Sequence, residues 1–154
     1  MGTEKIRIIG CGNPLASDDG VGAYIIGKLK KLNLPQNVEA VEAGSDPLGL
    51  LDLIQSAEKV IIVDAVKGPG PPGKIYRLKP QDLENSGKSI SLHRLEVNQI
   101  IKLGQKLFPD RTAEEIIIIG VEAEDLTPFK MGLSEPVKKA VPQIIEAVLK
   151  EINL

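Results

Sequence analysis

Three ionisable residues in separate parts of the sequence have the types needed to bind a divalent metal ion: Asp19, Asp64 and His93. Asp19 lies in a glycine-rich segment, Asp64 is the single carboxylate of an apolar run, and His93 is the only histidine. Carboxylate oxygens and a neutral imidazole nitrogen suit a first-row metal that keeps open coordination positions. A helix predicted to begin just after His93 favours the neutral imidazole, because the N-terminal end of a helix disfavours positive charge.

The glycine-rich segment, residues 10–22 (GCGNPLASDDGVG), joins a predicted strand to a predicted helix. Glycines there allow a ligand or another chain segment to come close to the backbone. The segment is not a dinucleotide fingerprint, because Leu15 stands where the third glycine is needed and Pro14 lacks an N–H donor. It also lacks the G-K-S/T of a Walker A loop, and Asp18 and Asp19 would repel a phosphate. The segment therefore favours a cation or a peptide as ligand.

The surroundings of Asp64 make an isolated charge costly. Residues 59–66 (KVIIVDAV) have the composition of a strand buried on both faces, where a carboxylate needs a partner or a metal ion. If this strand lies beside the strand at residues 5–11 in a parallel sheet, Asp19 and Asp64 emerge at the same edge. They would then lie within about two strand spacings of each other.

Each candidate residue also has a structural interpretation. Ser17 or Asp18 could cap the helix that follows, and the carboxylate of Asp19 would interact favourably with the helix dipole. Asp64 could cap the turn into the loop after its strand, and His93 could cap a surface helix. A single aspartate suffices for a cap, so the pair in the glycine-rich segment favours a further role.

The elements that must position these residues alternate between strand and helix, which is typical of a largely parallel sheet covered by helices. The last helix has Ser134 as its expected cap. Residues 67–73 (KGPGPPG) and the polar stretch 80–91 are expected to be loops. We expect strands at residues 5–11, 38–43, 59–66, 74–78 and 115–121, and helices at 19–31, 47–55, 95–108 and 134–152.

Length and composition predict one domain over residues 1–154 with an aliphatic core. A net charge of -2 and only four aromatic residues disfavour a nucleic-acid partner. A single cysteine excludes an internal disulfide and fits a reducing cytoplasm. The apolar run near the N-terminus is too short for a signal peptide or a membrane span, so we expect a cytoplasmic protein with no membrane partner.

Taken together, these motifs resemble the hydrogenase maturation endopeptidases, which remove a C-terminal extension from the large-subunit precursor of nickel–iron hydrogenases. The resemblance covers essentially the whole chain. It rests on Gly10, Gly12, Asn13, Leu15, Asp18, Asp19, Gly20 and Gly22 of the first segment, on Asp64 in IIVDAV, on His93 in SLHRL and on residues 43–47 (AGSDP).

The resemblance implies a three-layer α/β/α sandwich, phosphorylase/hydrolase-like, with a mixed, mostly parallel five-stranded sheet that has one antiparallel strand. It implies that Asp19, Asp64 and His93 contact a nickel ion supplied by the precursor and carry the reaction, with no tightly bound organic cofactor. It also implies that Gly12, Asn13, Gly44 and Ser45 contact the substrate.

Two other function classes remain open at this point. One is a thiol hydrolase that uses Cys11 with His93, although a cysteine that ends a buried strand is more often a small apolar residue than a nucleophile. The other is a non-catalytic module that binds a small ligand or a metal through the glycine-rich segment.

Overall fold

The computed structural model describes residues 4–85, 91–92 and 96–153. His93, one of the three predicted metal ligands, lies outside the described residues. Within these ranges no helix is both long and apolar enough to cross a bilayer.

Five main strands form a mixed sheet in the order β2-β1-β3-β6-β4. β4 is antiparallel to β6, whereas the other neighbours in this order are parallel. A sixth strand of two residues, β5 (Ser91–Leu92), pairs antiparallel with the end of β3. The main strands are β1 (Ile6–Cys11), β2 (Val38–Gly44), β3 (Lys59–Lys67), β4 (Ile75–Leu78) and β6 (Glu115–Glu122).

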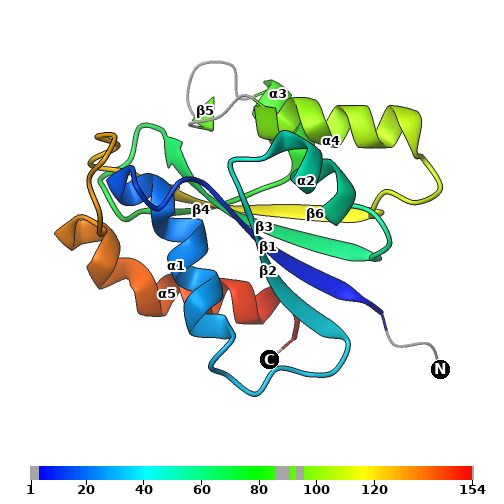
Figure 1. Cartoon of the computed structure of the whole chain (residues 1–154), viewed down its shortest axis with the longest axis horizontal. Helices are drawn as coiled ribbons and strands as arrows, with labels where there is room; N and C mark the ends of the chain where they lie inside the picture. The colour runs from blue at the N-terminus through cyan, green and yellow to red at the C-terminus, as the bar shows by residue number, and fades with distance from the viewer. Residues whose placement is uncertain (1–3, 86–90, 93–95, 154) are drawn as a thin grey trace.

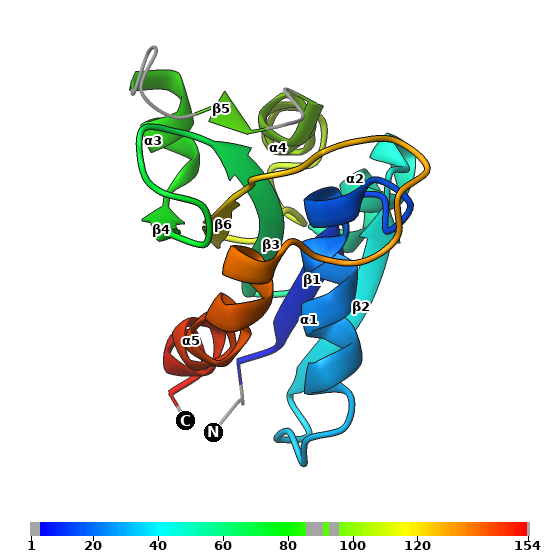
Figure 2. The ribbon, with the colours of Figure 1, turned by 90° about the vertical axis from the view of Figure 1, so that its left-hand side faces the viewer.

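Helices cover both faces of this sheet, which confirms the predicted three-layer sandwich (Figure 1). Figure 2 shows the same layers from the side. One face carries α1 (Val21–Leu29) and α5 (Glu135–Glu151), and the other carries α2 (Pro47–Leu53), α3 (Pro80–Asn85) and α4 (Glu96–Leu107).

Strand alternation divides the aliphatic residues between two cores. In β3, Ile61 and Val63 pack with α1 and α5, while Val60 and Ile62 pack under α2 and α4. Each fully buried aliphatic side chain of this size contributes about 1.5–3 kcal/mol. By the same alternation Asp64 belongs to the α2–α4 face, where it interrupts the second core at the end of the sheet.

α3 lies in the stretch that the sequence predicts to be a polar loop. Pro80 suits the first turn of a helix, and the backbone N–H of Lys79 donates to the Asp82 carboxylate at 2.8 Å. Leu83 packs against the core under α2 and α4. One apolar contact in six residues gives too little periodicity to predict a helix, and the pairing of β5 depends on a contact distant in sequence.

The predicted helix caps are confirmed in position for Ser134 and wrong for Ser17 and Asp18. A short 3-10 turn, η1 (Ser17–Gly20), precedes α1, and neither Ser17 nor Asp18 caps that helix with its side chain. Ser134 occupies the N-cap position of α5 but makes no capping bond. Its hydroxyl donates instead to the Asp18 carboxylate at 2.8 Å.

Asp18 fastens η1 to the loop between β6 and α5. Its buried carboxylate accepts hydrogen bonds from the backbone N–H groups of Glu124 at 2.8 Å, Asp125 at 3.0 Å and Ser134 at 2.8 Å, besides the Ser134 hydroxyl. Its own N–H donates to the Asp125 carbonyl at 2.9 Å. Bonds to an ionised acceptor are stronger than neutral ones, so this carboxylate holds two distant segments together.

We expect Asp18→Asn to lower the free energy of unfolding by about 2–4 kcal/mol, because an amide has a single accepting oxygen and its NH2 group would face the donors on the other side. Ser134→Ala is the matched control. It removes only the hydroxyl donor and should cost about 1 kcal/mol. Urea unfolding measures both variants, and equal losses would contradict the assigned role of Asp18.

Candidate functional site

The candidate site lies at the edge of the sheet formed by the C-terminal ends of β1 and β3. Gly10 and Val63 are the last residues paired between these strands, so Cys11 and Asp64 follow level with each other. On the other side of β3, Asp64 pairs with Gly120 of β6. The predicted neighbourhood of the first and third strands is therefore confirmed.

Close backbone packing sets the position of the turn that carries Asp19. Gly12 has φ +116°, and a Cβ there would collide with the carbonyl oxygen of Asp19. A Cβ on Gly22, in the first turn of α1, would lie 2.6 Å from the carbonyl oxygen of Val63. Only glycine permits both approaches, so η1 and α1 lie directly against the ends of β1 and β3.

Asp19 is held in this turn by its backbone and its carboxylate. Its side chain is buried, and one carboxylate oxygen accepts a hydrogen bond from the backbone N–H of Asn13 at 2.9 Å. The Asn13 side chain in turn accepts from the N–H of Leu15 at 2.9 Å, which tightens the loop. Two of the predicted substrate contacts, Gly12 and Asn13, thus lie against Asp19: Gly12 packs on its backbone, and the N–H of Asn13 orients its carboxylate.

Asp64 has none of its surface exposed and lies within β3 itself. One of its carboxylate oxygens accepts a hydrogen bond from the backbone N–H of Ala65 at 2.9 Å. The structure therefore brings Asp19 and Asp64, which are 45 positions apart (64 minus 19) in the sequence, to the same edge of the sheet. Both carboxylates are buried, and a backbone N–H group orients each of them.

The position of His93 is not described, but its neighbour in sequence is. Leu92 pairs with Val66, two positions beyond Asp64 in β3. Among the residues that the structure describes, no group of three His, Cys, Asp or Glu side chains forms a metal site.

Glu122, at the end of β6, is a buried carboxylate at this edge that the sequence analysis missed. The N–H of Gly68 donates to both of its oxygens, at 2.9 and 3.0 Å, and the Tyr76 hydroxyl donates to one at 2.8 Å. Burial and this bond to Glu122 raise the pKa of the Tyr76 hydroxyl. Glu122 thus holds the loop after β3. Its place at the end of an apolar strand, like that of Asp64, is the signal that could have identified it.

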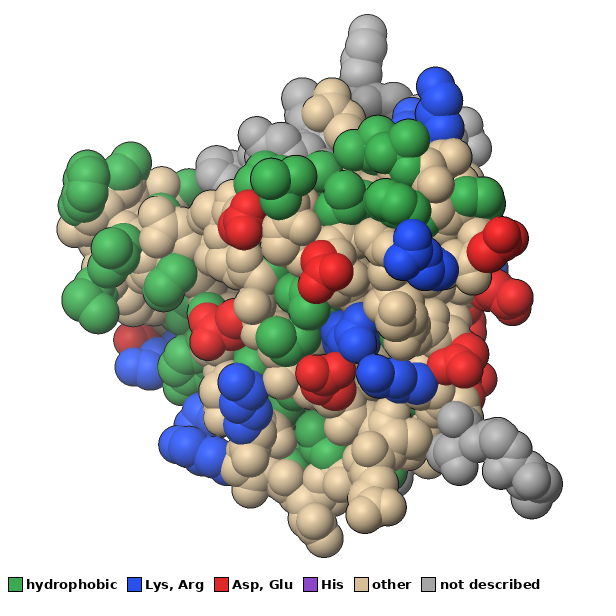
Figure 3. Space-filling model, turned by 45° about the vertical axis from the view of Figure 1, so that its right-hand side comes forward, with side chains coloured by type: hydrophobic (Ala, Val, Ile, Leu, Met, Phe, Trp, Pro, Cys, Tyr) green, Lys and Arg blue, Asp and Glu red, His purple; other side chains and the backbone are tan. Residues whose placement is uncertain are grey.

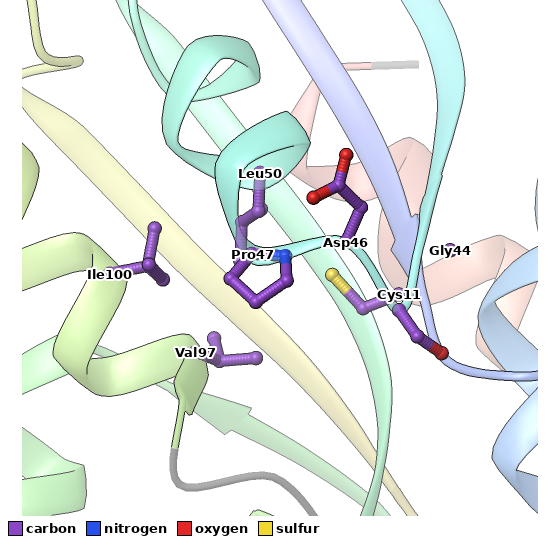
Figure 4. Close-up of a pocket in the computed structure, with 8 residues that line it drawn as sticks. Cys11, Gly44, Asp46, Pro47, Leu50, Val97 and Ile100 are labelled. Carbon is purple, nitrogen blue, oxygen red and sulfur yellow. The ribbon is translucent and has the colours of Figure 1, made fainter.

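The other two predicted substrate contacts, Gly44 and Ser45, line a small pocket between the end of β2 and α4 (Figure 4). The Cys11 sulfur points toward Pro47 on one side of this pocket, and Val97 lies on the opposite side. The cavity measures about 20 Å³, which is room for about one water molecule. Cys11 itself is buried with the core under α2 and α4, as the sequence predicts.

The chain matches known proteins over nearly its whole length. Residues 23–151 match the family model of the HycI hydrogenase maturation proteases. A protein of Methanocaldococcus jannaschii assigned as a hydrogenase maturation protease is 38% identical, over 99% of this chain and 99% of its own. The delta subunit of the coenzyme F420 hydrogenase of Methanothermobacter thermautotrophicus is 30% identical, over 97% of this chain and 96% of its own.

Solved structures agree with this result. The hydrogenase-maturating endopeptidase HybD from Escherichia coli superposes with a TM-score of 0.83 and 26% identity, over 96% of this chain and 91% of its own. A [NiFe] hydrogenase maturation protease from Thermococcus kodakarensis shares the fold with a TM-score of 0.79 and 24% identity, over 96% of this chain and 98% of its own. The chain therefore belongs to the hydrogenase maturation protease family, whose members are endopeptidases.

Proposed function

We propose that this protease removes the C-terminal extension of a nickel-loaded large-subunit precursor of a nickel–iron hydrogenase. In this proposal Asp19, Asp64 and His93 contact the nickel ion, which arrives as part of the precursor. The reaction needs no organic cofactor.

The observation that carries the proposal is the placement of two buried carboxylates from separate elements at one edge of the sheet. Keeping Asp19 and Asp64 ionised away from water costs free energy, and a divalent cation placed between them would offset that cost. A precursor that brings nickel would thus be bound more tightly than one that lacks it. Cleavage would therefore occur only after the metal has been inserted.

The backbone bonds to these carboxylates support a role as metal ligands. The N–H groups of Asn13 and Ala65 fix the orientation of Asp19 and Asp64 respectively. Hydrogen bonds from a second layer of groups orient metal ligands and typically change metal affinity or activity by about 10–100-fold. We assign His93 as the third ligand, because it follows directly after Leu92, which pairs with Val66, two positions beyond Asp64 in β3.

The substrate chain is proposed to pass along the turn after β2 and the glycine-rich segment. Ser45 is exposed there, and the carbonyl of Gly44 accepts the N–H of Gly12 at 3.0 Å, so the two turns form one continuous surface. Gly12, Asn13, Gly44 and Ser45 would hold the precursor backbone while the nickel ion positions the scissile bond. We place the reaction in the cytoplasm, with neither nucleic acid nor membrane as partner, because a lone thiol suits a reducing compartment.

We expect Asp19→Asn and Asp64→Asn each to slow cleavage of the nickel-loaded precursor by at least about 100-fold, because each removes a charged metal contact. The wild-type protein should cleave the nickel-loaded precursor and leave the nickel-free precursor intact. Single-turnover assays, in which the gel mobility of the large subunit reports cleavage, measure both variants with the loaded precursor and the wild type with each form of the precursor.

Asp110→Asn is the matched control, since Asp110 is exposed and lies just before β6 at the opposite edge of the sheet. It should cleave at the wild-type rate. Thermal melts separate a lost contact from a lost fold. The proposal is wrong if either site variant melts like the wild type and still cleaves rapidly, or if nickel-free precursor is cleaved as fast as the loaded form.

The thiol mechanism makes the opposite prediction for Cys11. Because Cys11 is buried in the core and lines a cavity of about 20 Å³, we expect Cys11→Ala to keep most of the processing rate. The lost packing should cost only about 1 kcal/mol of stability. Loss of several orders of magnitude in rate, with the fold preserved and with the same loss after iodoacetamide treatment of the wild type, would establish a thiol nucleophile.

A further inference from the structure

The loop between β6 and α5 exposes apolar side chains next to the turn that carries Asp19. Phe129 is 92% exposed and Met131 is 78% exposed, and Leu15 of the glycine-rich segment is 46% exposed beside them. We call these three residues the apolar tip. Figure 3 shows hydrophobic side chains gathered at the left edge of the molecule, the side where Figure 1 places this loop.

Backbone hydrogen bonds join the two segments of the apolar tip. The N–H of Lys130 donates to the carbonyl of Leu15 at 3.0 Å, and the N–H of Ser17 donates to the carbonyl of Lys130 at 2.7 Å. The Ser17 hydroxyl also donates to the carbonyl of Gly132 at 3.0 Å. The loop therefore lies alongside η1 as a bridged segment and does not project freely into solvent.

Phe129 adopts a backbone conformation that aromatic residues rarely take. Its φ is +60°, in the left-handed region. Hydrogen bonds on both sides hold it there: Asp125 accepts from Thr127 and from the Lys130 ammonium, and these bonds keep the pKa of Asp125 well below its usual range. Because the Phe129 ring is exposed, it contributes almost no buried apolar surface to this fold. Burial of the ring therefore does not account for the left-handed conformation.

The apolar tip is also coupled to the candidate site. Asp18 binds the N–H groups of Glu124 and Asp125, at the start of the same loop, and Asp19 is the next residue. A protein held by the apolar tip would thus be fixed relative to the carboxylate of Asp19. Exposed aromatic and methionine side chains are typical anchors of protein interfaces.

We propose that the apolar tip docks into an apolar pocket on the folded body of the hydrogenase precursor, and this inference rests on the function proposed above. Phe129 and Met131 protrude from the surface, so their partner must be concave. A folded body can offer a preformed pocket, whereas the C-terminal extension, as a single chain segment, cannot. Docking of the body beside η1 would leave the extension free to reach Asp19 and Asp64.

The test is Phe129→Gly, which removes the ring and suits the left-handed backbone. We expect it to unfold at a higher urea concentration than the wild type, because the backbone conformation suits glycine. In single-turnover cleavage, the half-saturating concentration of nickel-loaded precursor should rise at least tenfold, with the saturating rate within twofold of the wild type. Leu107→Ser is the control, since Leu107 is exposed at the end of α4, and both quantities should stay unchanged.

A competition arm identifies what the apolar tip binds. Mature large subunit without the extension should compete with the precursor for the wild-type protein and compete at least tenfold less well for Phe129→Gly. Three results would overturn the inference: an unchanged half-saturating concentration, Phe129-dependent competition by a synthetic extension peptide, or a dimer lost in Phe129→Gly with precursor binding intact. Failure of the wild type to cleave would instead refute the proposed function, and Phe129-dependent binding of the mature subunit would still be measurable.

Discussion

The close approach of the glycine-rich turn to the ends of β1 and β3 sets the position of Asp19 relative to Asp64. The backbone of Asp19 packs against Gly12, and the backbone of Gly22 packs against Val63, at separations that no Cβ could occupy. A side chain at either position would push η1 away from the sheet. Asp19 would then move away from Asp64, which is fixed within β3. The distance between the two carboxylates thus depends on two glycines that carry no chemistry of their own.

In the described part of the chain, four buried carboxylates lie at this end of the sheet: Asp18, Asp19, Asp64 and Glu122. Asp18 and Glu122 bind backbone N–H groups of loops distant in sequence, so they hold the loops that surround the edge. Asp19 and Asp64 accept N–H groups from their own segments. The loops that Asp18 and Glu122 hold form a rim around the edge where Asp19 and Asp64 lie. The proposed docking through the apolar tip uses this rim, because Asp18 couples the loop of Phe129 to the turn of Asp19.

Much of this arrangement could be predicted from short-range patterns. The run at residues 59–66 predicts β3 to within one residue, and strand neighbourhood predicts that Asp19 and Asp64 share an edge. The role of Asp18 was missed because its partners lie more than 100 residues away, and a helix cap is the only local use for such an acid. Glu122 was missed because its partners, Gly68 and Tyr76, lie 54 and 46 residues away in the sequence. Position 129 carries no turn signal for a left-handed phenylalanine, because the backbone bonds that hold its loop join Lys130 to Leu15 and Ser17, which are distant in sequence.

We propose that Asp19 and Asp64 together contact the nickel ion of the precursor. Nickel K-edge X-ray absorption tests it directly, on nickel-loaded precursor alone and frozen rapidly with the wild-type protein or with an Asp19→Asn/Asp64→Asn double variant. Co-elution establishes that both proteins bind the precursor. Compared with the precursor alone, we expect additional oxygen scattering in the first shell of nickel with the wild type and none with the double variant. Identical nickel spectra with both proteins, while the wild type still cleaves, would contradict it.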